Sequence, residues 1–299
     1  MLFRATCLTI FSLVATFAVP ANALEICGDM RQGELFYIRG NPMENIVIFN
    51  NLGKKNYFSD KQGMTLMALH RNAPKEVKMT VYAGNGAKTS YELKIEPAQW
   101  DIQRVEGVQP HHVAPSKTHA AEIAREQKDV NMALAGAKSG GKPAGVADSY
   151  SFWSEGFILP VEGRISGHFG NQRIFNGVPK SPHSGTDIAA PEGTPVKASA
   201  GGKVVLSGKD YFYTGNMVII DHGHQLQTIY AHLKDATVTA GDEVHQGDII
   251  GHVGKTGRAT GPHLHWGASL NNVRFRPHSL LDLSDKKCRH IHEKHMGEQ

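Results

Sequence analysis

The chain has 299 residues, of which 40% are hydrophobic, and its formal net charge is +4 at pH 7. This mild positive charge favours contact with anionic polymers such as cell wall. No run of lysine and arginine is dense enough to indicate a nucleic-acid groove, so a nucleic-acid partner is not expected. The length allows two hydrophobic cores.

The first two dozen residues have the pattern of a secretory signal. Arg4 supplies a positive charge, residues 5–19 are almost uncharged and apolar, and the small-residue sequence Ala21-Asn22-Ala23 follows. No later segment has the roughly 20 consecutive apolar residues that a membrane-spanning helix needs. We therefore expect residues 1–23 to be a signal peptide, and the mature protein to be exported without a membrane anchor.

Removal of that signal leaves two cysteines, Cys27 and Cys288, near the two ends of the mature chain. An even pair in an oxidising compartment can form a disulfide. Two unpaired thiols are the alternative, because the sequence does not show whether the two side chains meet in space.

Residues 24–108 are expected to form a small all-β domain of the sandwich type. Short β-rich runs alternate there with turn residues such as Gly84-Asn85-Gly86. The runs are residues 35–39, 45–49, 64–69, 77–82 and 91–95. Nothing in this region indicates catalysis.

Residues 109–150 are interpreted as a linker. Residues 117–137 are rich in Ala, Glu, Lys and Gln, with Ser116 available as N-cap and Gly136 near the end, which predicts a helix flanked by flexible segments. His111 and His112 are expected to be solvated.

Residues 151–284 lack helical periodicity and contain many glycine turns. Strand-length runs predict a mostly antiparallel β domain, so the chain as a whole is expected to be mostly β. These runs are residues 203–207, 217–221, 227–231 and 248–253. Residues 285–299 are interpreted as a histidine-rich tail, solvated and disordered rather than metal-scavenging, that carries His290, His292 and His295.

Two segments of this last domain indicate a metal site. One runs from His183 to Asp187, and the other ends in His263-Leu264-His265-Trp266. Alternate side chains of a strand point to the same side, so His263 and His265 share one face. Asp187 adds a carboxylate and His183 a third nitrogen, a donor set that suits tetrahedral zinc with one position left for water.

Three further histidines have weaker signals. His232 follows Ile229-Tyr230-Ala231, and it is either a packed histidine at a strand end or a base. His222 and His224 flank a glycine, where solvated turn residues are favoured over a second metal site.

These segments resemble the lysostaphin-type zinc endopeptidases, also called LytM-domain peptidases. Their pattern is His-x-Gly-x-Asp, Ala-Pro-x-Gly-Thr-Pro-Val, Tyr-x-His-Leu and Thr-Gly-x-x-Thr-Gly-Pro-His-Leu-His, and every element occurs here in order over residues 155–283. The segments that begin at Trp100, Ala114 and Gly163 also resemble proteobacterial members with an amino-terminal β domain.

The resemblance implies that His183, Asp187 and His265 hold one Zn²⁺ ion per chain. It also implies that His232 and His263 face the reacting water and carbonyl, so His263 is not the ligand that the strand argument allowed. Where members commonly have Phe-Glu, this chain has Trp266-Gly267, which is expected to change the shape of the groove more than the chemistry.

The function implied by the resemblance is hydrolysis of peptide cross-links in peptidoglycan, whose peptide stems would be the partner of a monomeric enzyme. The proteobacterial resemblance favours the periplasm and the D-alanyl–meso-diaminopimelate bond. One alternative is a non-catalytic relative that binds wall or activates an amidase, and another is a different substrate such as a glycine-rich protein. The amino-terminal domain is expected to restrain the site, with substrate docking as the alternative.

Overall fold

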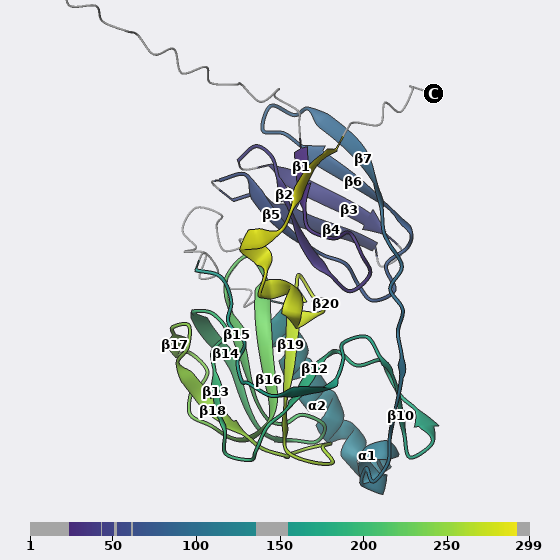
Figure 1. Ribbon diagram of the computed structural model, residues 1–299, viewed down its shortest axis with the longest axis vertical. Coiled ribbons are helices and arrows are strands. Elements are labelled where there is room, and N and C mark those ends of the chain that lie inside the picture. Colours follow the sequence, from purple (N-terminus) through teal and green to yellow (C-terminus); the bar gives the residue numbers. More distant parts are fainter. Residues whose placement is uncertain (1–23, 43, 51–52, 61, 136–154, 292–299) are drawn as a thin grey trace, which may run out of the picture.

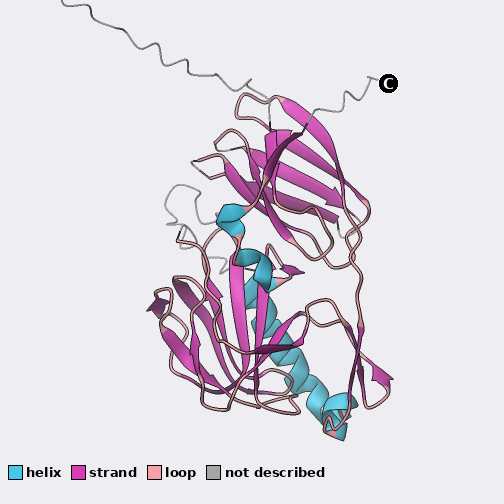
Figure 2. Ribbon diagram, in the orientation of Figure 1, coloured by secondary structure: helices cyan, strands magenta, loops and turns pink. Residues whose placement is uncertain are grey.

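The computed structural model describes residues 24–42, 44–50, 53–60, 62–135 and 155–291. The expected signal peptide lies outside this part of the chain, as do Gly136, His292 and His295. The described chain is mostly β, as predicted, with one long helix (Figures 1 and 2). No helix in the described ranges has the length and apolar character needed to cross a membrane.

Two four-stranded antiparallel sheets form the amino-terminal β domain (Figure 1), with strand orders β21-β1-β2-β5 and β4-β3-β6-β7. Fully buried side chains such as Ile26, Phe36 and Met79 belong to its core. The strands are β1 (Leu24–Cys27), β2 (Leu35–Arg39), β3 (Asn45–Asn50), β4 (Gly53–Phe58), β5 (Met64–Ala68), β6 (Glu76–Tyr82), β7 (Lys88–Lys94) and β21 (Cys288–Ile291). The five predicted strands are confirmed as β2, β3, β5, β6 and β7.

Strand β4 was not predicted from the sequence. It is an edge strand that pairs only with β3 within its sheet, and it begins Gly53-Lys54-Lys55-Asn56. An edge strand can carry charged residues because one side is open to water, and this polar sequence hides the alternation by which strands are recognised.

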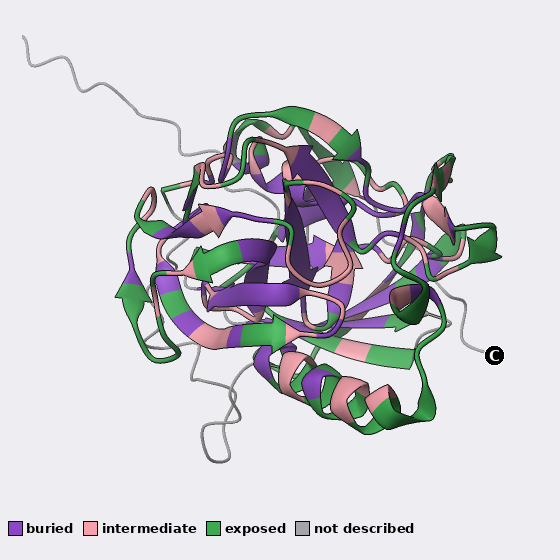
Figure 3. Ribbon diagram, turned by 90° about the horizontal axis from the view of Figure 1, so that it is seen from below, coloured by how far each residue is buried: buried purple, intermediate pink, exposed green. Residues whose placement is uncertain are grey.

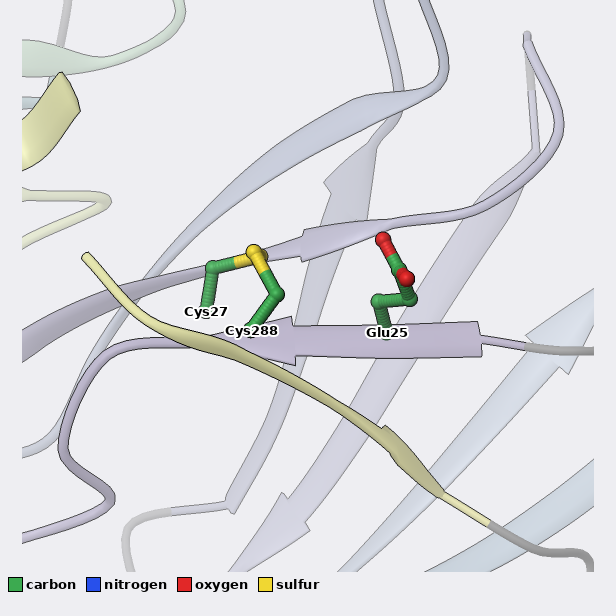
Figure 4. A group of neighbouring side chains, drawn as sticks. All are labelled: Glu25, Cys27 and Cys288. Atoms are coloured by element: carbon green, nitrogen blue, oxygen red, sulfur yellow. A yellow bond between two sulfur atoms is a disulfide. The ribbon is translucent and has the colours of Figure 1, made fainter. Parts of the chain in front are cut away.

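The carboxy-terminal residues form a strand of the amino-terminal sheet. In β21, Cys288 lies directly opposite Cys27 of β1, and a disulfide joins the two cysteines (Figure 4). The expectation of a disordered tail is wrong for these residues, because backbone pairing with β1 and the disulfide hold them in place. The side chain of His290 nevertheless remains exposed.

The carboxy-terminal β domain is built on a ten-stranded sheet with the central order β17-β14-β15-β16-β19-β12-β9. The predicted runs correspond to β14, β15, β16 and β18, and the antiparallel pairing is confirmed. The strands are β9 (Arg164–Gly167), β12 (Gly185–Ala189), β13 (Pro195–Lys197), β14 (Gly202–Tyr211), β15 (Gly215–Asp221), β16 (Leu226–Ala236), β17 (Glu243–Val244), β18 (Ile249–Val253), β19 (His263–Leu270) and β20 (Val273–Phe275). Two short 3-10 helices, Pro277–Leu280 and Leu283–Asp285, lead from this domain to β21.

The predicted helix exists as α2 (Lys117–Leu134), with Ser116 at its N-cap position. The Ser116 side chain makes no capping hydrogen bond. Ala133 and Leu134 pack against buried residues of β15 and β16, and Figure 3 shows the helix along the outside of the domain with its buried positions on one side. The helix is therefore part of the carboxy-terminal domain rather than a free linker.

The segment between the two domains is also held against the carboxy-terminal domain. Strand β8 (Ile102–Val105) pairs in parallel with β10 (Gln172–Phe175), which also pairs with β11 (Val178–Pro179). The short helix α1 (Pro110–Val113) follows. The rings of His111 and His112 contact Phe212. His111 is nevertheless exposed, as expected, and His112 is part-buried.

Candidate metal centre

The three residues expected as metal ligands meet at the neighbouring strands β12 and β19, with His183 in the loop just before β12. Asp187 lies directly opposite His265 in the antiparallel register. Nε2 of His183 lies 3.0 Å from Oδ1 of Asp187 and 3.0 Å from Nδ1 of His265. The latter atom lies 2.9 Å from the same carboxylate oxygen, so one atom of each residue faces a common point.

This donor set fits zinc. Zinc bonds of about 2.0 to 2.1 Å in tetrahedral geometry place neighbouring ligand atoms roughly 3.3 Å apart, close to the separations found here. Nδ1 of His183 donates to the backbone oxygen of His168 over 3.0 Å, which leaves the Nε2 lone pair free for a metal. Such a hydrogen bond is the usual second contact of a metal-bound histidine.

Two glycines make room for the cluster. A Cβ at Gly185 would lie 2.7 Å from the His265 ring and 2.5 Å from the backbone oxygen of Trp266. A Cβ at Gly167 would lie 2.7 Å from Oδ2 of Asp187. Both distances are too short for a side chain, which explains the glycine between His183 and Asp187 in physical terms.

His232 and His263 lie beside the cluster, with their ring centroids 4.8 Å apart. His263 is on the same face of β19 as His265, as predicted, and its Nε2 lies 3.8 Å from Oδ1 of Asp187. His232 has φ of 62° at a register irregularity of β16. A bulge of this kind changes the direction of a side chain relative to a regular strand.

Each of these two histidines is oriented by a backbone oxygen. Nδ1 of His232 donates to Thr256 over 2.8 Å, and Nδ1 of His263 donates to Gly261 over 2.8 Å. A neutral imidazole carries one proton, so Nε2 of each ring is left as a proton acceptor.

Burial keeps the histidines of the cluster neutral. It lowers the pKa of His183 to about 4, although Asp187 acts in the opposite direction. Burial and the charges of His263 and His265 lower the pKa of His232 well below its usual range. Burial alone would raise the pKa of Asp187, but its close contacts with His183 and His265 outweigh burial and hold that pKa well below its usual value. Neutral imidazoles with an ionised carboxylate are the state in which these groups bind a metal.

Two residues that the sequence did not single out lie beside the cluster on the β8–β10 pair, and one of them, Arg173, contacts Asp187 directly. Arg173 donates from Nη2 to Oδ2 of Asp187 and from Nε to Oε1 of Gln103 over 3.2 Å. Nε2 of Gln103 donates to the backbone oxygen of Ser166 over 3.1 Å. Arg173 thus forms its hydrogen bond with Oδ2, the outer carboxylate oxygen of Asp187, and leaves Oδ1 facing the histidines. Sequence spacing could not reveal this contact, because Gln103 and Arg173 are 70 residues apart.

A cavity of about 360 Å³ opens beside the cluster. Asp187, His232 and His263 line it, together with residues of β8, β10 and the loop before β19. Gln103 and Arg258 are among these lining residues. Arg258 was missed by the sequence interpretation although it lies within the second motif segment.

Two expectations about individual residues are wrong. Trp266 is fully buried and its ring contacts His278, because it follows His265 and points to the opposite face of β19. It therefore cannot shape the groove. His222 is not a solvated turn residue but is fully buried, with its ring nitrogens 2.7 Å from the backbone oxygen of Gly201 and 2.7 Å from the hydroxyl of Thr228.

Comparison with known proteins matches residues 181–277 to the family described as Peptidase family M23. Over 98 residues the chain is 47% identical to DD-carboxypeptidase/endopeptidase Mpg of Neisseria meningitidis serogroup B. The aligned region covers 33% of this chain and 22% of that protein. Over 136 residues it is 39% identical to peptidoglycan DD-endopeptidase ShyA of Vibrio cholerae. That aligned region covers 45% of this chain and 31% of that protein. The matched parts span less than a third of these two relatives.

A crystal structure from Pseudomonas aeruginosa, described as a peptidase M23, resembles most of the present structure. The TM-score is 0.59 at 27% sequence identity, over 85% of this chain and 95% of that one. The likeness includes regions outside the matched residues 181–277. The carboxy-terminal β domain is thus a peptidase family M23 domain, the family whose LytM-type members its motifs resemble.

Proposed function

We propose that this protein is a zinc-dependent endopeptidase that hydrolyses peptide cross-links of bacterial peptidoglycan, at the D-alanyl–meso-diaminopimelate bond. The observation that carries the proposal is the convergence of His183, Asp187 and His265 on one point beside a cavity. The family match and the names of relatives such as peptidoglycan DD-endopeptidase ShyA support the choice of substrate.

In this proposal His183, Asp187 and His265 hold one zinc ion. Zinc at this position would polarise the scissile carbonyl and make water a better nucleophile near neutral pH. Arg173 positions the Asp187 carboxylate through its outer oxygen, which keeps the inner oxygen directed at the metal.

His232 and His263 transfer protons during hydrolysis in this proposal. Their Nε2 atoms are acceptors because their Nδ1 atoms donate to backbone oxygens. One ring can take a proton from the attacking water, and the pair can deliver a proton to the leaving amine. Positioned acid and base groups of this kind contribute about 10²- to 10⁴-fold to a rate.

We further propose that the protein is exported and acts as a monomer in the periplasm. The disulfide between Cys27 and Cys288 supports an oxidising compartment. The predicted signal peptide and the cell-wall substrate of the named relatives point the same way.

The test is incubation of the purified mature chain with cross-linked muropeptides, read by mass spectrometry. We expect hydrolysis that a chelator abolishes and added zinc restores. A non-catalytic relative would bind the muropeptides and leave their masses unchanged. Cleavage of a glycine-rich protein but not of muropeptides would support the other alternative and contradict the proposed substrate.

A further inference from the structure

One cation beside the proposed active site has no protein anion to balance it. Arg258 lines the same cavity as Asp187, His232 and His263. Among the described residues its guanidinium makes no ion pair, and it lies over two aromatic rings. An arginine that lies part-buried without an acceptor is unusual, because burial of an unpaired charge is unfavourable.

The two rings hold the guanidinium in a fixed place. Its central carbon lies 4.9 Å from the ring centroid of Phe175 and 4.4 Å from that of Tyr213. Cation–π contacts of this kind favour the charged form without using the N–H groups as hydrogen-bond donors. The five N–H donors are therefore free for a ligand, in the planar arrangement that matches a carboxylate.

The neighbouring charges add to the positive character of this part of the cavity. Burial, followed by the charge of Arg173, lowers the pKa of Arg258 to about 10, so the side chain stays charged at neutral pH. Arg104 of β8 also lines the cavity. Asp187 is the acidic residue among the described lining residues, and Arg173 already engages it.

We infer that Arg258 binds a free carboxylate of the substrate on the residue that supplies the leaving amine, and so selects peptides that carry this group. The inference rests on the proposed function, because it concerns the same site. Arg258 lines the same cavity as Asp187, His232 and His263, so the carboxylate must lie close to the scissile bond. In a D-alanyl–meso-diaminopimelate cross-link, the carbon bonded to the scissile nitrogen bears such a carboxylate. The interior of a glycine-rich protein has none.

The competing explanation is that Arg258 only clamps Phe175 of β10 against Tyr213. Both explanations predict that loss of Arg258 lowers activity. They differ in whether the loss depends on the carboxylate of the substrate.

The test uses two cross-linked peptides that differ only at that carboxylate, which is free in one and converted to a carboxamide in the other. The full mature protein should show a kcat/KM about 10- to 100-fold higher for the free carboxylate, as expected for charge-assisted hydrogen bonds. Arg258→Gln should lose this preference, because its kcat/KM should fall about 10- to 100-fold further on the free carboxylate than on the carboxamide. Arg258→Lys, which retains the charge without the planar fork, should recover part of the preference.

Lys255→Gln is the matched control. Lys255 lies three residues away, is largely exposed and pairs with Glu192, and it is absent from the cavity lining. Both of its rates should equal those of the wild type. Thermal unfolding of each variant checks that the fold is retained.

A binding measurement separates this inference from the proposed function. Calorimetric titration of the zinc-loaded His263→Ala variant with each peptide should show the same preference without turnover, and addition of Arg258→Gln should remove it. Equal wild-type rates and equal affinities for the two peptides would overturn the inference. An equal loss of kcat/KM on both peptides in Arg258→Gln would overturn it as well. If the wild type hydrolyses neither peptide, the proposed function fails, and the titration alone decides whether Arg258 binds the carboxylate.

Discussion

The two β domains bury different kinds of side chain. The core of the amino-terminal sandwich is mostly apolar, and carboxylates buried beside it have protein partners. Asp60 accepts from the backbone N–H groups of Gln62 and Met64, and Glu44 accepts from the side-chain amide of Asn41. The carboxy-terminal domain instead buries four ionisable side chains that face one another, namely His183, Asp187, His232 and His265. Burial of such groups is unfavourable unless they are paired or bind a metal, so the difference identifies the domain that carries the chemistry.

Potential metal ligands also differ between the two domains. Within the described residues of the sandwich, the group formed by Glu25, Cys27 and Cys288 could in principle bind a metal, but its two sulfurs are joined to each other (Figure 4). The two sulfurs thus serve stability in the sandwich, whereas the nitrogen and oxygen atoms of His183, Asp187 and His265 remain available for a ligand.

The largest expected effect separates ligands from proton-transfer groups inside the cluster. His183→Ala, Asp187→Ala or His265→Ala removes one of three protein ligands, so zinc content and activity should fall together. His232→Ala or His263→Ala should keep most of the zinc and lose about 10²- to 10⁴-fold in turnover. Metal content and muropeptide hydrolysis are measured on every variant. If His263→Ala loses zinc as completely as His265→Ala does, strand β19 supplies two ligands and the assignment is wrong.

The second prediction concerns the sandwich. Replacement of Cys27 and Cys288 by serine should lower the free energy of unfolding by about 4 to 5 kcal/mol, since the disulfide closes most of the chain into one loop. Denaturant unfolding checks this value. Zinc content should not change, because the site lies in the other domain.

The disulfide itself is tested by mass measurement after alkylation. Unreduced mature protein should take up no alkylating agent, and reduced protein should take up two equivalents. Two alkylated thiols without reductant would disprove the bridge.

A smaller effect is expected from pH, through a buried histidine away from the cluster. Burial lowers the pKa of His222 to about 4, against the opposing hydrogen bond with Gly201, whereas its unfolded value is about 6.5. The unfolded state binds more protons below pH 6.5, so a stabilising contribution of about 3 kcal/mol is lost as the pH falls from 6.5 to 4. His222→Gln, which does not titrate, should show a shallower loss of stability over this range. Equal slopes for the two proteins would mean that His222 is protonated in the folded state.

The smallest expected effect tests whether the segment before the helix restrains the site. Gln103→Ala in the full chain removes the contacts with Arg173 and Ser166, and should raise turnover about 2- to 10-fold, the range of one or two hydrogen bonds. Ile102→Thr is the control, because this exposed residue of the same strand is absent from the cavity lining. Lower turnover in Gln103→Ala would instead support a role of β8 in substrate docking.

The sequence alone predicted many of the strands and suggested the ligand set. Alternation along a strand is a local property, so it placed His263 and His265 on one face before any fold was known. The unbroken motifs, through the family resemblance, then assigned His265 as a proposed ligand and His263 as a proposed proton-transfer residue. The helix at 117–134 was also predictable, because its composition is local information.

The tertiary structure decided which distant segments meet. It paired Cys27 with Cys288, added β21 to the amino-terminal sheet, and packed α2 on the carboxy-terminal domain. It also brought Gln103 and Arg173 to Asp187, left Arg258 without an anionic partner, and buried His222. None of these contacts has a periodic signal in the sequence, because each depends on the packing of segments that lie far apart along the chain.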